Sequence, residues 1–198
     1  MHSNSKTKFA VVILLSASML ATGCSAQWIS VALADLPVLT QMALNIAGLV
    51  ATLQSGKQLS PTEAAAIQNI SAEASKDLTL LQTFYNDYKA NPSADTMQKI
   101  ENVIADINQN LPALLQAAHI NDPILAARVT AGVNLILTTV TSFASLIPQT
   151  AAPSTARKTQ RTVAIPKAKD LKKQWNQQVC APTGNAGFDA AFTTCALR

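Results

Sequence analysis

The chain has 198 residues and a formal net charge of +4, but this charge is unevenly distributed. Residues 24–150 hold five basic and nine acidic side chains, whereas residues 151–198 hold eight basic and two acidic. The protein therefore combines a mildly acidic body with a basic C-terminal segment, which excludes the uniformly basic chain that a pI of 9.1 would suggest. Few aromatic residues and few glycines favour a helical fold.

Residues 1–23 have the three zones of a secretory signal peptide. Residues 1–8 are polar and basic, residues 9–21 form an apolar run, and small residues precede Cys24. The apolar run is shorter than the ~20 residues that a membrane-spanning helix needs. The segment therefore predicts an exported protein.

The segment Leu20-Ala21-Thr22-Gly23-Cys24 resembles the bacterial lipobox, although alanine stands where leucine is commonest. The resemblance implies a lipoprotein precursor, with lipid attached to Cys24 before cleavage and two or three acyl chains holding the mature protein at a membrane. Ser25 in place of aspartate implies the periplasmic face of the outer membrane. The alternative is an ordinary secretory signal that is cut after Ala26 and leaves a soluble protein.

Residues 24–147 contain four stretches in which apolar residues recur every three or four positions. The first is expected over residues 28–54, with Pro37 in its first turn or at a kink. The second starts at Ser60-Pro61, where Glu63 is placed to close a capping box.

Ser93 is expected to cap the third helix, and Asp122 to cap the fourth. Pro112 should kink or briefly break the third, and Pro148 closes the fourth. Four helices with short connections can bury their stripes only against one another. The sequence therefore predicts an all-α fold, an antiparallel up-down four-helix bundle with a short helical, disulfide-clipped tail.

Residues 36–56 and 129–149 contain no charged side chain, and their polar residues are uncharged ones such as Gln, Asn, Thr and Ser. Both stretches are long enough to cross a bilayer. The favoured interpretation is a pair of inner bundle helices. The alternative is a partner-binding surface or a hairpin that inserts into a membrane.

Residues 148–166 are rich in Pro, Ala and Thr, which predicts an exposed linker. Residues 167–198 form the basic C-terminal segment, in which an apolar stripe runs beside lysines. Either this segment packs on the bundle, or it binds an anionic surface. The residues assigned to that surface are Lys167, Lys169, Lys172, Lys173 and Trp175.

Cys180 and Cys195 are close in sequence and lie in a chain predicted to be exported, so they are expected to form a disulfide. On the loop-entropy model, closing a loop of this length stabilises the segment by ~3 kcal/mol. No His or further Cys lies nearby in sequence to suggest a metal site.

The sequence offers no catalytic motif, so no enzyme activity, metal or cofactor is predicted. His119 is assigned to a helix end, and the carboxylates Glu73, Asp77 and Asp87 to a solvated flank. The aromatic cluster at residues 84–88 is expected in the core, although it could line a ligand cavity.

These features predict a lipid-anchored, non-enzymatic binding or scaffold module of the bacterial cell envelope. Its partner is expected to be the membrane through the lipid, and also an envelope protein or an anionic surface of lipid, lipopolysaccharide or cell wall. Nucleic acid is not expected. The alternatives are a carrier or sensor of a small apolar ligand, and a membrane-inserting helical hairpin.

Overall fold

The computed structural model describes the backbone of residues 5–56, 58–147 and 167–198, and side chains within these ranges from Ile29 onward. This part of the chain is all-α and contains no strand. Its helices are α1 (Ser5–Ser55), α2 (Pro61–Ala90), α3 (Ala94–Ala117), α4 (Pro123–Ala144), α5 (Ala168–Gln178) and α6 (Ala186–Thr194).

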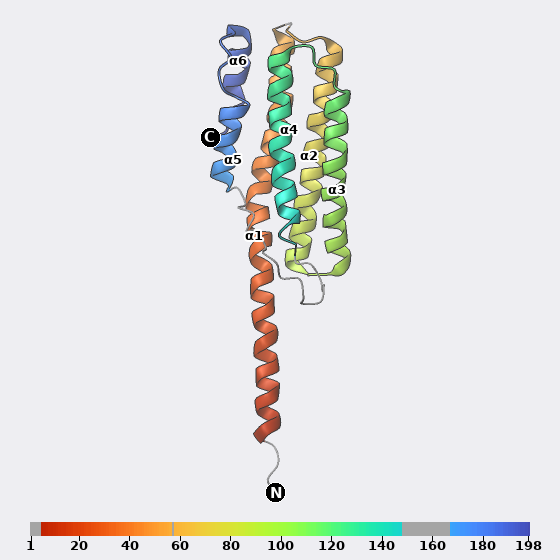
Figure 1. The fold of residues 1–198 in the computed structure, drawn as a ribbon, viewed down its shortest axis with the longest axis vertical. Helices are drawn as coiled ribbons and strands as arrows, with labels where there is room; N and C mark the ends of the chain where they lie inside the picture. Colours follow the sequence, from red (N-terminus) through yellow and green to blue (C-terminus); the bar gives the residue numbers. More distant parts are fainter. Residues whose placement is uncertain (1–4, 57, 148–166) are drawn as a thin grey trace, which may run out of the picture.

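The four long helices lie side by side, and the short helices α5 and α6 lie along one flank of them (Figure 1). Each long helix contacts the next in the chain, and α4 also contacts α1. Both α5 and α6 contact α1, and α5 contacts α4 as well. The C-terminal segment is thus packed against the long helices.

The helix starts follow from local capping chemistry, as predicted. Ser60 accepts a hydrogen bond from the Glu63 N–H, and the Glu63 carboxylate accepts one from the Ser60 N–H, so the capping box is complete. The side chain of Ser93 caps α3, and that of Asp122 caps α4. These bonds satisfy backbone N–H groups that have no partner inside the helix.

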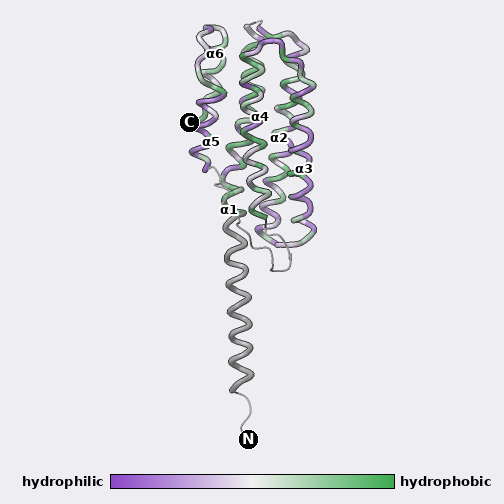
Figure 2. Tube along the Cα trace, in the orientation of Figure 1, coloured by the Kyte–Doolittle hydropathy of each residue, from purple (hydrophilic) through white to green (hydrophobic). Residues whose placement is uncertain are grey.

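The predicted apolar stripes form the core. In α1 the apolar residues that recur every three or four positions are buried, namely Leu36, Leu39, Met42, Ala43, Ile46, Leu49, Val50 and Leu53. In α4 the same holds for Leu125, Val129, Val133, Ile136, Val140 and Phe143, and Ile147, just after the helix, is buried too. Tyr88 in α2 and both Met97 and Leu114 in α3 are only partly buried and pack at the core's edge. Figure 2 shows hydrophobic residues concentrated on α4 and on the coloured part of α1, whereas α3 is largely hydrophilic.

Helices α1 and α3 differ from the prediction. The backbone of α1 extends to Ser5, well before the expected start at residue 28, so Pro37 lies inside the helix and not in its first turn. Pro112 does not interrupt α3, which continues to Ala117. Pro112 is exposed and lies inside the helix.

Candidate functional site

The N-terminus of α5 is capped by a residue from another helix. Lys167 occupies the N-cap position but makes no side-chain capping bond. Instead, the carboxyl group of Asp35 in α1 accepts a hydrogen bond from the Ala168 N–H. A negative group at this position also suits the positive end of the helix dipole. Asp35 therefore fixes where α5 begins along α1.

Asp35 is itself an unusual core residue. Its side chain is 2% exposed, and its Oδ2 has no hydrogen-bond partner among the described atoms. Burial raises the pKa of Asp35 from 3.8 to about 6, and the bond from Ala168 opposes that rise. The role of this residue could not be predicted from the sequence, because a single acid in an apolar helix forms no recognisable pattern.

The C-terminus of α5 is held by a cation from α4. The Arg128 guanidinium donates to the carbonyl oxygens of Gln178 at 2.6 Å and Ala181 at 3.2 Å. It also lies over the ring of Phe192, 5.8 Å from the centroid. A cation at a helix C-terminus is electrostatically favourable. Charges from α1 and α4 thus hold the two ends of α5.

Trp175 fixes the middle of α5 to the long helices. Its indole is fully buried, and Nε1 donates to the carbonyl oxygen of Cys195 at 2.8 Å. The same carbonyl accepts a hydrogen bond of 2.9 Å from Asn45 in α1. Trp175 belongs to the core in this structure, so it offers no surface for an anionic partner.

The predicted disulfide is present in the structure between Cys180 and Cys195, which are 15 residues apart. It joins the end of α5 to the end of α6. Together with the bonds to the Cys195 carbonyl, it ties the two short helices into one unit on α1.

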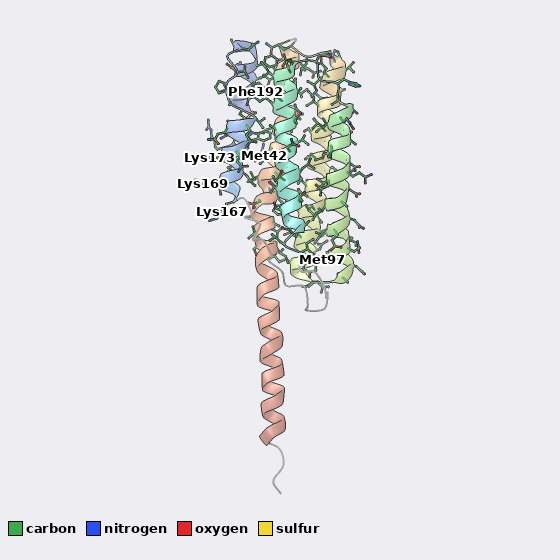
Figure 3. All side chains as sticks on the ribbon, viewed as in Figure 1. Met42, Met97, Lys167, Lys169, Lys173 and Phe192 are labelled. Atoms are coloured by element: carbon green, nitrogen blue, oxygen red, sulfur yellow. A yellow bond between two sulfur atoms is a disulfide. The ribbon has the colours of Figure 1, made fainter. Side chains whose placement is uncertain are left out.

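The lysines of α5 lie at the surface. Lys167, Lys169 and Lys173 are exposed, and Figure 3 shows them on the outer side of α5. Lys172 is partly buried, and its ammonium group donates to the carbonyl oxygen of Arg198 at 2.7 Å. Among the described residues, the ion pairs within 4 Å all involve Lys76. The candidate site is therefore a set of lysines without the predicted tryptophan.

Cys24, the predicted lipidation site, lies outside the described side chains, as do residues 1–23, the predicted signal peptide. The α1 backbone passes through position 24. The predicted linker at residues 148–166 also lies outside the described residues.

One of the three acids that were predicted to lie on a solvated flank of α2 is buried. Asp77 is only 5% exposed, and its Oδ2 has no hydrogen-bond partner among the described atoms. Burial, and then the neighbouring charge of Glu73, raise the pKa of Asp77. The assignment to a solvated flank is wrong for Asp77, because this side chain lies toward the packed side of the helix.

The aromatic cluster of α2 belongs mainly to the core. Tyr85 is fully buried and meets Phe143 edge to face, with ring centroids 6.4 Å apart. A cleft of about 690 Å³ lies nearby, between α3, the end of α2 and the end of α4. Its lining mixes apolar side chains such as Met97 and Ile104 with polar ones such as Glu101.

Two described helices are long and apolar enough to cross a membrane, Ile29–Ser55 and Pro123–Ala144. Nearly half of the most apolar window of each, 44%, is buried inside the protein. A core helix of a soluble protein meets the same criterion. His119 is exposed just after α3, and the described residues contain no cluster of acids, histidines or cysteines that could hold a metal.

Comparison with known proteins finds no matching family model, no matching curated protein and no matching solved structure. The class of protein must therefore be inferred from the residues and contacts described above.

Proposed function

We propose that this protein is a lipid-anchored, non-enzymatic binding module of the bacterial cell envelope. In this proposal Cys24 carries the lipid, and the α5–α6 unit presents its lysines to an anionic surface. The observation that carries the proposal is the combination of a firmly docked α5 with exposed lysines that have no acidic partner within 4 Å among the described residues.

The docking of α5 supports a binding role for its outer side. Asp35, Arg128 and Trp175 hold the helix at its start, end and centre. The lysines on the outer side are therefore presented from a rigid element, which lowers the entropic cost of binding. A flexible tail would lose this advantage.

We further infer that α1–α4 form an antiparallel up-down four-helix bundle. The connections between α2, α3 and α4 are only a few residues long, and such connections favour antiparallel neighbours. The bundle would serve as a rigid scaffold for α5 and α6.

The proposal is tested by expressing the full chain in a bacterium and measuring the mass of its mature N-terminal peptide. A diacylglyceryl group on Cys24, with loss of residues 1–23, is the expected result. The Cys24→Ser variant should lack the lipid, and it should no longer fractionate with the membrane through an acyl anchor. A mature chain that starts beyond Cys24 without lipid would overturn the proposal.

The second candidate function is the transport or sensing of a small apolar ligand, and the cleft near Met97 and Ile104 favours it. It predicts that an uncharged lipophilic fluorophore binds the protein saturably, and that Ile104→Gln weakens this binding. Fluorescence unchanged from buffer would remove this candidate.

A further inference from the structure

The lysine end of α5 lies on the side of the molecule from which the N-terminal part of α1 emerges (Figure 1). The Asp35–Ala168 hydrogen bond places the start of α5 beside residue 35 of α1. Cys24 is eleven residues earlier on the same helix, and at a rise of 1.5 Å per residue this amounts to about 16 Å. This is about two Debye lengths at physiological ionic strength, so the lysines attract an anionic surface strongly only when the domain leans toward the membrane.

We propose that Lys167, Lys169 and Lys173 bind the anionic phospholipid headgroups of the same membrane that holds the lipid of Cys24. The domain would then lean toward that membrane on its α5 side. This inference rests on the proposed lipid anchor, and it adds the identity of the anionic surface and the orientation of the domain.

The charge distribution at this end of the molecule favours that orientation. Residues 167–173 hold four lysines and only one acid, Asp170. The turn between α2 and α3 lies toward the same end, and there Asp87 and Asp95 accompany Lys89. A negative membrane surface therefore attracts the α5 side more strongly than the α2–α3 turn.

The anchor makes weak attraction sufficient. Once acyl chains hold the protein at the bilayer, the lipid headgroups are present near the lysines at a high effective concentration. A basic patch near a lipid anchor is a recognised second membrane signal. The lysines would thus set the domain's orientation and would not have to supply the affinity.

Lysine footprinting of the full lipidated protein tests the inference. The protein is reconstituted into vesicles of phosphatidylglycerol and phosphatidylethanolamine, or of phosphatidylcholine alone, and acetylation rates are read by mass spectrometry. We expect Lys167, Lys169 and Lys173 to be acetylated about fivefold more slowly on the anionic vesicles, and the protection to disappear at high salt. Lys89 and Lys99 are the internal comparison and should not change.

A pair of charge-matched variants provides the control. Lys169→Gln/Lys173→Gln should abolish the protection of the remaining Lys167, whereas Lys89→Gln/Lys99→Gln should preserve it. Equal acetylation rates on the two kinds of vesicle would overturn the inference. Protection that requires added lipopolysaccharide or peptidoglycan would also overturn it, by assigning the lysines to another anionic surface.

Failure of the lipid anchor would look different. The protein would then not float with vesicles of either composition, and its N-terminal peptide would carry no lipid. That result would remove the proposed function, whereas floating protein with unprotected lysines would remove only the orientation.

Discussion

Trp175 in α5 packs directly against Gly132 in α4: a Cβ added to Gly132 would lie 3.1 Å from Cζ3 of the indole. The same Cβ would lie 3.5 Å from Cδ1 of Ile46 in α1. The missing side chain at position 132 thus lets the C-terminal segment approach both α1 and α4. This contact explains why a short basic helix becomes part of the core.

Gly132→Ala should destabilise the protein by about 1 kcal/mol. Alanine gains about 1 kcal/mol of helix propensity, but overpacking against a fixed indole costs about 1–3 kcal/mol. Gly48→Ala is the matched control, because its Cβ would meet nothing within 4 Å, and it should stabilise by up to about 1 kcal/mol. Urea unfolding measures the free energy of unfolding of the two variants. Equal stabilisation by both would show that the Trp175 side chain shifts to accommodate the added methyl group.

Asp35→Asn should raise stability at neutral pH. Because the folded-state pKa of Asp35 is raised from 3.8 to about 6, the folded protein holds this proton more tightly than the unfolded chain does. Its contribution to stability is fully present below pH 4 and is lost as pH rises through 6, by at most about 3 kcal/mol. Asparagine keeps an acceptor for the Ala168 N–H and has no charge to bury.

The measurement for Asp35 is the melting temperature of the wild type and the variant between pH 4 and pH 8. The difference between them should be small at pH 4 and should grow up to about pH 7. A difference that stays constant across this range would mean that Asp35 does not titrate in the folded state.

Arg128→Met should loosen the C-terminal end of α5. The change removes two charged hydrogen bonds and a ring contact, with an expected cost of about 1–3 kcal/mol. The hydrogen-exchange rates of α5 and α6 amides should rise more than those of α2 amides. Lys99→Met is the control, because Lys99 also lies over an aromatic ring, that of Phe84 at 5.7 Å, but far from α5 in sequence. Equal exchange rates of the α5 and α6 amides in both variants would show that Arg128 does not hold the C-terminal end of α5.

Cys180→Ser/Cys195→Ser should lower stability by up to about 3 kcal/mol on the loop-entropy model. Limited proteolysis should then cut the α5–α6 unit sooner. Adding a reductant to the wild type should have the same effect and should leave the double variant unchanged. Wild-type protein that alkylates at both cysteines without reduction would contradict the disulfide.

Much of the fold could be predicted from the sequence, because helix formation depends on near neighbours. The capping box at Ser60 and Glu63 and the cap at Asp122 are set by residues three positions apart. The apolar stripe of Leu171, Trp175 and Val179 is buried, which agrees with the interpretation that the segment packs on the bundle and not with the assignment of Trp175 to a surface. What the stripe could not reveal was whether that face met the long helices or a membrane.

The sequence by itself determined the helices, the capped starts of α2, α3 and α4, the apolar faces and the proximity of the two C-terminal cysteines, since each is encoded within one or a few turns. Only the tertiary structure decided that Asp35 and Arg128 hold the two ends of α5, and that Gly132 makes room for Trp175. These contacts join residues 40 or more positions apart, and packing of whole helices brings them together. A single acid, arginine or glycine carries no periodic pattern that would foretell its distant partner.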